Sequence, residues 1–134
     1  MNELLVDTNI LVYAIDEDSE FFAKSRFILS KTDCQLCTTS KNFAEFLAVT
    51  TRGQNSLSMG DALEVIEDYL SLLTVLFPND HSFEVFRELL SKYQPAGLKV
   101  HDFEIISIAL AHRPESFRRL SWCDSSVWSC MVPP

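Results

Sequence analysis

The spacing of apolar and polar residues along this chain predicts strands that alternate with helices. Short segments at Leu4–Val6, Cys34–Thr39 and Thr74–Phe77 have the length of buried strands. Leu4–Val6 is a continuous apolar run, which is typical of a parallel strand covered on both faces, so we expect it to be a central strand. Repeated strand–helix units predict an α/β fold, with a central parallel sheet flanked by helices.

Helices are predicted where apolar residues recur at helical spacing after a polar residue able to cap the first turn. The first helix is expected after a Thr8 or Asn9 cap, with Ile10, Tyr13 and Ala14 on its apolar face, and the second between Ser19 and about Ser30, with Phe22, Ala23 and Phe27 on its apolar face. The third is expected from a Ser40 cap to Gly53, and the fourth from a Ser58 cap to about Leu72. The fifth is expected from an Asp80 cap, with an apolar stripe up to Tyr93, and the last covers Phe103 to Ala111. The last is apolar nearly all round, which predicts a helix buried against the sheet.

Length and charge narrow the class of protein. A chain of 134 residues that is 47% hydrophobic is expected to form one domain over residues 1–134. The net charge of −8 argues against binding nucleic acid by bulk electrostatics, although an enzyme can still meet phosphates through bound cations. Because Met1–Glu3 lacks a basic signal-peptide start and no segment approaches about 18 apolar residues, a cytoplasmic protein is expected.

The four cysteines give only a weak indication of a metal or redox site. Cys34 and Cys37 have the spacing of a metal knuckle, but residues three apart on a strand point to opposite faces, and Cys123 and Cys130 do not repeat the spacing. Reduced, partly buried thiols are therefore expected. A thioredoxin-type role is disfavoured because that motif opens a helix.

Three acidic residues lie where an α/β fold gathers ligands. Asp7 directly follows the first strand, Glu45 lies with Asn42 on one face of the helix after the second strand, and Asp102 precedes the buried last helix. Since ligands bind at the carboxyl ends of parallel strands, these carboxylates can converge there. Taken singly, Asp7 and Asp102 could instead be helix caps and Glu45 a surface residue.

Three segments resemble the motifs of the PIN-domain ribonucleases, and in particular the VapC-type toxins of bacterial toxin–antitoxin pairs. They are Val6-Asp7-Thr8-Asn9-Ile10-Leu11-Val12-Tyr13-Ala14, Phe43-Ala44-Glu45-Phe46-Leu47-Ala48-Val49 with Arg52 beyond it, and Val100-His101-Asp102 followed by the apolar helix. Each motif alone is loose, but their order and separations in one chain are fairly specific. The resemblance covers roughly residues 1–112.

The resemblance implies a PIN fold and a metal-dependent endoribonuclease. Asp7, Glu45 and Asp102 would be the catalytic, metal-binding carboxylates, with Thr8 and Asn9 supporting the site. Crowded carboxylates repel one another unless a cation neutralises them, and a set of oxygen ligands suits magnesium or manganese and not zinc. The implied reaction is hydrolysis of RNA phosphodiester bonds, with one or two cations. A small antitoxin and a homodimer are the implied protein partners.

The end of the chain departs from the family pattern from about residue 113. Asp124 is the one counterpart there of a fourth metal-binding acid, after a possible final strand at Leu120–Trp122. The alternative function is therefore a catalytically impaired PIN-like domain that binds protein or RNA. An aspartyl-phosphate phosphatase would want a second Asp where Asn9 stands, and a P-loop enzyme is excluded because the chain has no glycine-rich loop.

Overall fold

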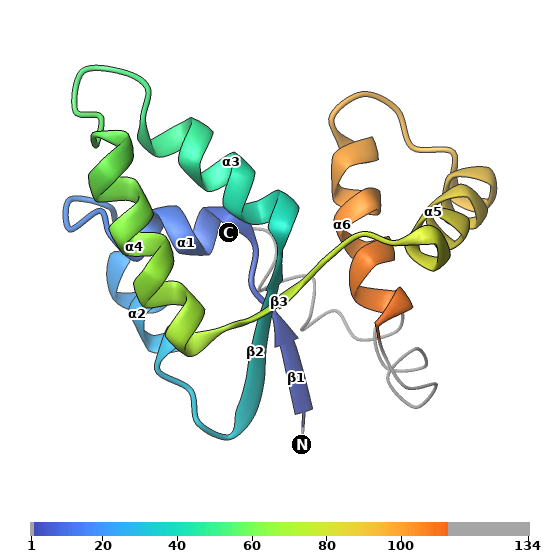
Figure 1. Ribbon diagram of the computed structural model, residues 1–134, viewed down its shortest axis with the longest axis horizontal. Helices are drawn as coiled ribbons and strands as arrows, with labels where there is room; N and C mark the ends of the chain where they lie inside the picture. The colour runs from blue at the N-terminus through green and yellow to red at the C-terminus, as the bar shows by residue number, and fades with distance from the viewer. Residues whose placement is uncertain (1, 113–134) are drawn as a thin grey trace.

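The computed structural model of this protein describes residues 2–112, which form a parallel sheet between two groups of helices (Figure 1). The elements follow the chain as β1 (Asn2–Leu5), α1 (Thr8–Tyr13), α2 (Phe22–Leu29), β2 (Cys34–Thr39), α3 (Ser40–Thr50), α4 (Met59–Leu72), β3 (Thr74–Leu76), α5 (Asp80–Tyr93) and α6 (Lys99–Ala111). The predicted α/β architecture, with a parallel sheet flanked by helices, is confirmed.

The strand order of the described sheet is β1-β2-β3, so β2 and not β1 lies at its centre. Asn2 pairs with Cys34 and Leu5 with Cys37, while Cys37 and Thr39 pair with Thr74 and Leu76 on the other side. Within residues 2–112, β1 pairs with β2 alone, and the predicted final strand at Leu120–Trp122 lies outside these residues, so the central position of the first strand stays a prediction. The apolar run at Leu4–Val6 reflects helices above and below the strand, and such cover does not require a neighbour on each side.

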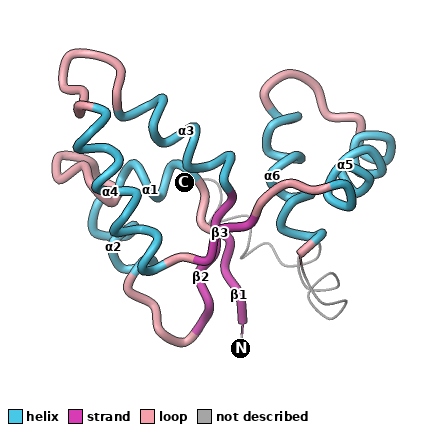
Figure 2. Tube along the Cα trace, in the orientation of Figure 1, coloured by secondary structure: helices cyan, strands magenta, loops and turns pink. Residues whose placement is uncertain are grey.

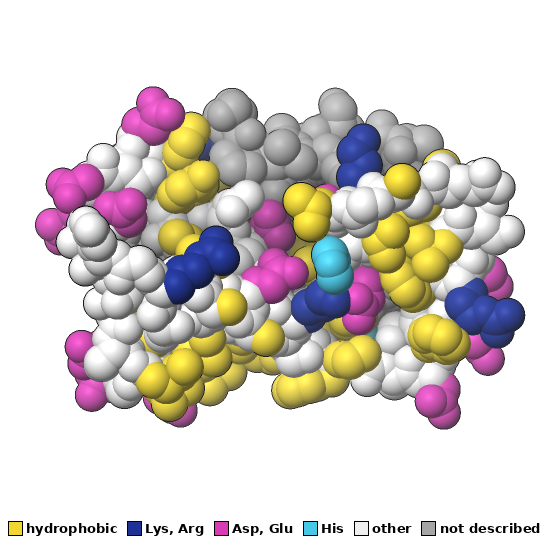
Figure 3. Space-filling view, turned by 90° about the horizontal axis from the view of Figure 1, so that it is seen from above, with side chains coloured by type: hydrophobic (Ala, Val, Ile, Leu, Met, Phe, Trp, Pro, Cys, Tyr) yellow, Lys and Arg dark blue, Asp and Glu magenta, His cyan; other side chains and the backbone are white. Residues whose placement is uncertain are grey.

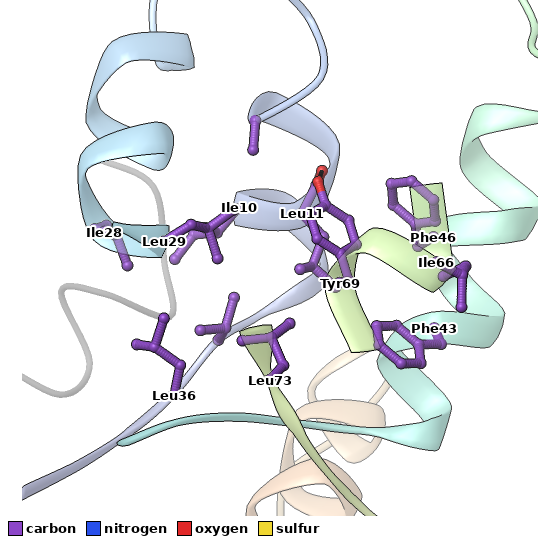
Figure 4. Close-up of a cluster of buried hydrophobic side chains, with 12 residues drawn as sticks. Ile10, Leu11, Ile28, Leu29, Leu36, Phe43, Phe46, Ile66, Tyr69 and Leu73 are labelled. Atoms are coloured by element: carbon purple, nitrogen blue, oxygen red, sulfur yellow. Dashed lines mark hydrogen bonds between the residues drawn. The ribbon is translucent and has the colours of Figure 1, made fainter. Parts of the chain in front are cut away.

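Side chains of each strand alternate between two hydrophobic cores. Leu36 and Val6 belong to the core under α1 to α4, whereas Leu5, Cys37 and Leu76 belong to the core under α5 and α6. Figure 4 shows the larger core, where the Tyr69 ring from α4 lies between Leu11 and Phe46, and the Tyr69 hydroxyl donates to the Leu11 carbonyl at 2.5 Å. Because successive side chains of a strand point to opposite faces of the sheet, each face is covered by its own core and helices, and the fold has three layers.

The chain passes from one helical layer to the other after β3. In Figure 2 the loop after β3 crosses to the side of the sheet where α5 and α6 lie, and these two helices pack closely on each other. Within residues 2–112, no helix is long and apolar enough to span a membrane.

The structure corrects several of the predicted caps. Thr39, and not Ser40, caps α3, and Asn79, and not Asp80, caps α5. In both cases the cap accepts from the backbone N–H three residues on, and the side chain of that third residue bonds back. The predicted Ser58 cap of α4 is confirmed by a 3.1 Å bond from the Asp61 N–H.

The predicted apolar stripe of α2 was also wrong. Ala23 is exposed and Phe27 is 65% exposed, while Ile28 and Leu29 face the core. The Phe27 ring instead lies beneath the Lys31 ammonium, 5.4 Å from its centroid, which lets this aromatic side chain stay at the surface. The predicted strand at Leu120–Trp122 and the tail from about residue 113 lie outside the described residues, as do Cys123 and Cys130.

Candidate functional site

Asp7 lies just past the carboxyl end of β1, where the chain turns into α1. The Val6 N–H still donates to Cys37 at 2.7 Å, so the chain leaves the sheet immediately before Asp7. Asp7 occupies the cap position of α1, but its side chain makes no capping hydrogen bond. Neither Thr8 nor Asn9 is the cap, because the helix already begins at Thr8. The Asp7 carboxylate thus faces the carboxyl edge of the sheet without serving the usual role of a cap.

Glu45 is connected to Asp7 through two buried polar residues. The Thr8 hydroxyl donates to Glu45 Oε2 at 2.9 Å, and Asn42 Nδ2 donates to Thr8 Oγ1 at 3.0 Å and to Asp7 Oδ1 at 3.3 Å. Asn42 and Glu45 are one helical turn apart on α3, which begins directly after β2. The ends of two adjacent strands therefore bring these two carboxylates onto one hydrogen-bond network.

Asp102 approaches the same edge from the opposite helical layer. The helix α6 begins at Lys99, earlier than predicted, so Asp102 lies within its first turn and is not its cap. Close by, Lys41 of α3 forms an ion pair and hydrogen bond with Glu104 of α6. This pair joins the helix that carries Glu45 to the helix that carries Asp102.

Burial and neighbouring negative charges affect the protonation of Asp7 and Asp102. The pKa of Asp7 is raised to about 6, chiefly by burial; the negative charges of Asp102 and Glu45 add to the increase, and hydrogen bonds from the Thr8 backbone and Asn42 oppose it. Burial also raises the pKa of Asp102, with the Glu45 charge adding to the increase and His101 and Lys99 opposing it. The negative charges of Asp7 and Asp102 are therefore costly in the protein without a bound cation.

Figure 3 looks from above onto the edge where the strands of Figure 1 end. Acidic side chains gather near the middle of this face, next to a histidine and several basic side chains. The surface thus carries both charges: carboxylates suited to a cation, and basic groups suited to a phosphate chain.

The donor set at this edge suits a hard cation. Among residues 2–112, no group of three or more His, Cys, Asp or Glu side chains has an arrangement that could hold a metal ion. Magnesium, however, usually takes one or two carboxylates and fills its other positions with water and substrate phosphate, whereas structural zinc needs a closed set of protein ligands. Asp7, Glu45 and Asp102 therefore do not form a closed set of three ligands, but one or two of these carboxylates could hold a hard divalent cation whose other positions are filled by water and substrate phosphate.

The other predicted site residues have different positions. Thr8 is buried within the network, whereas Asn9 is exposed on the first turn of α1. Asp124 lies outside the described residues, so its predicted role stays a prediction. No role was predicted for Asn42, although the spacing Thr39-x-x-Asn42 is that of a cap and its third helical residue.

Comparisons with known proteins agree with the fold. The family model of the PIN domain matches residues 4–117. The fold is similar to VapBC2 from Rickettsia felis bound to a DNA fragment from their promoter, with a TM-score of 0.59, 20% identity, and coverage of 87% of this chain and 92% of that chain. A search of curated proteins gave no match.

Two further solved structures share the fold. VapBC-1 from nontypeable Haemophilus influenzae gives a TM-score of 0.55 at 22% identity, with 89% of this chain and 92% of that chain covered. DNA-bound VapBC from Salmonella typhimurium gives a TM-score of 0.55 at 24% identity, with 83% and 81% covered. At these identities the likeness concerns the fold.

Proposed function

This chain belongs to the PIN domain family, and from that premise we propose that it is a magnesium- or manganese-dependent endoribonuclease and the toxin of a toxin–antitoxin pair. The observation that carries the proposal is the acidic site itself: Asp7 and Glu45 share one buried network, and the charge of Asp102 acts on Asp7. An enzyme with a net charge of −8 needs a cation to bring a phosphodiester to such an edge.

Asp7, Glu45 and Asp102 would hold the cation. When bound, it would polarise the scissile phosphate and lower the pKa of the attacking water. Asp7 would remain a ligand at neutral pH because a nearby divalent charge favours its ionised form and offsets the effect of burial. Glu45 would keep its orientation because the Thr8 hydroxyl holds one of its oxygens.

Basic residues beside the carboxylates would position the RNA. Lys41 lies one helical turn before Glu45, and His101 directly precedes Asp102. A phosphate that approaches the cation could compete with Glu104 for the Lys41 ammonium, since lysine presents a mobile point charge with three donors. These two residues would therefore contribute to substrate binding, while the carboxylates supply the ligands of the cation.

The proposed partners follow from the family resemblance and from the similar VapBC structures. A small antitoxin would neutralise the toxin, and the toxin would form a homodimer. Asp124 would add a further acid to the site. Light scattering after size exclusion tests the dimer, and co-purification with the product of an adjacent short reading frame tests the antitoxin.

The experiment that tests the activity is cleavage of single-stranded RNA by the purified full chain. In millimolar Mg²⁺ or Mn²⁺ we expect internal cleavage roughly a hundredfold faster than in EDTA, because cation stabilisation of the transition state contributes several kcal/mol. A DNA strand of the same sequence tests the preference for RNA. RNA binding without metal-dependent cleavage would contradict the proposal and support the binding-module alternative.

A further inference from the structure

Asn42 is an uncharged residue that is fully buried beneath the acidic edge and uses its whole hydrogen-bonding capacity. Its amide nitrogen donates to Asp7 Oδ1 at 3.3 Å and to Thr8 Oγ1 at 3.0 Å. Its carbonyl oxygen accepts from the Thr39 N–H at 3.2 Å and from Thr39 Oγ1 at 2.6 Å. An asparagine side chain offers two protons and two lone pairs, so every one has a partner here.

The direction of these bonds is fixed by the backbone. Because the Thr39 N–H can only donate, it identifies the side-chain atom of Asn42 that faces it as the oxygen, and the amide protons must point to Asp7 and Thr8. Thr8 receives one of these protons, and its own hydroxyl proton then goes to Glu45 Oε2. The side-chain protons of Asn42 and Thr8 therefore lead to the carboxylates of Asp7 and Glu45, whereas Thr39 donates to the Asn42 oxygen from the other side.

We infer that Asn42 is a positioning residue, which sets the placement of Asp7 directly and that of Glu45 through Thr8 and so prepares both carboxylates for one cation. This inference rests on the proposed metal-dependent function. The buried Asn42 side chain bonds to Asp7 and to Thr8, and Thr8 bonds to Glu45. These bonds hold the Asp7 and Glu45 carboxylates at a set separation, although the negative charge of Glu45 acts on Asp7. Groups that orient metal ligands in this way commonly affect metal affinity by 10- to 100-fold.

A purely structural role for Asn42, as part of the cap of α3, predicts something different. The chain has a second cap of this kind at α5, where Asn79 is the cap and Ser82 is the third helical residue. There the Ser82 hydroxyl accepts from the Asn79 N–H at 2.8 Å, so a serine suffices for the cap. A serine at position 42 has one proton and a shorter reach, and it cannot donate to Asp7 and Thr8 together.

The test is Asn42→Ser, with Ser82→Ala as the matched control that weakens the other cap. Both variants are first checked for cooperative thermal unfolding, and Mn²⁺ binding to the full chain without RNA is then measured by titration calorimetry. We expect Asn42→Ser to weaken Mn²⁺ binding by roughly tenfold or more and Ser82→Ala to leave it unchanged. Equal affinity in wild type and Asn42→Ser would overturn the inference.

A second measurement needs neither metal nor RNA. In the nuclear magnetic resonance spectrum of the metal-free protein, the two side-chain amide protons of Asn42 should respond to different changes, one to Asp7→Asn and the other to Thr8→Val. If neither proton shifts, Asn42 does not hold the carboxylates. If wild type binds no Mn²⁺ but both protons shift, the proposed metal site fails while the link from Asn42 to the carboxylates stands. Thr8→Val also serves for the Mn²⁺ titration if Asn42→Ser does not fold.

Discussion

Replacing Asp7 by asparagine is expected to reduce metal-dependent RNA cleavage by roughly two to three orders of magnitude. The substitution keeps the size of the side chain but removes a negatively charged cation ligand, and a loss of about 3 to 4 kcal/mol in transition-state stabilisation corresponds to that factor. Glu45→Gln and Asp102→Asn are expected to reduce cleavage in the same direction. Initial rates of cleavage of one RNA at saturating Mn²⁺ provide the measurement.

Asp33→Asn is the matched control for this series. Asp33 is an exposed acid that precedes β2, at the amino edge of the sheet, so the same change of charge is made on the opposite side of the molecule. Its cleavage rate should equal that of wild type. Retention of the wild-type rate by Asp7→Asn, in protein that cleaves RNA only with metal, would show that the active carboxylates lie elsewhere.

The metal-free protein is expected to lose stability as pH rises from 4 to above 6, and Asp7→Asn should remove part of this loss. The pKa of Asp7 rises from 3.8 in the unfolded chain to about 6 on folding, so the folded state binds the proton more tightly. This tighter binding stabilises the folded state fully below pH 3.8, and the stabilisation is lost as pH rises through 6. The loss lowers the free energy of unfolding by up to about 3 kcal/mol. The raised pKa of Asp102 acts in the same direction.

The difference between wild type and Asp7→Asn isolates this effect from other titrating groups. In chelator at pH 7.5, urea unfolding should show Asp7→Asn to be more stable by roughly 2 to 3 kcal/mol, and below pH 4 the two should converge. Added Mn²⁺ should stabilise wild type and leave Asp7→Asn nearly unchanged, because a ligand of the folded state shifts the unfolding equilibrium. If the free energies of unfolding of the two proteins change with pH in parallel, Asp7 is not the source of the stability lost above pH 4.

Local sequence patterns were sufficient to predict the order of the elements. The strand Cys34–Thr39 and the end of α4 at Leu72 agree with the structure, since period and capping are local properties. The order of the described strands, with β2 between β1 and β3, was not predictable in this way, because an apolar run shows that a strand is covered and not which strands pair with it. In α2, the spacing of Phe22 and Phe27 predicted that these aromatic residues face the core, but Ile28 and Leu29, which follow them, are the buried apolar residues.

The candidate site shows the same division between local and tertiary information. Asp7 and Glu45 were placed by their distance from strand ends, which the sequence displays directly. Asn42 was missed because its role depends on Thr8 and Thr39, which reach it from the ends of two different strands. Asp102 was placed near the edge correctly, but its position within α6 depends on a helix start that carries no side-chain cap.

We propose that Asp7, Glu45 and Asp102 lie around a divalent cation bound at the carboxyl edge of the sheet. Crystals of the full chain soaked in Mn²⁺ test it most directly, because the anomalous scattering of manganese locates the ion without reference to activity. We expect an anomalous peak among these three carboxylates, bound directly or through water, and no such peak in Asp7→Asn. A peak bound elsewhere, or the absence of any peak from this edge at millimolar Mn²⁺, would contradict the claim.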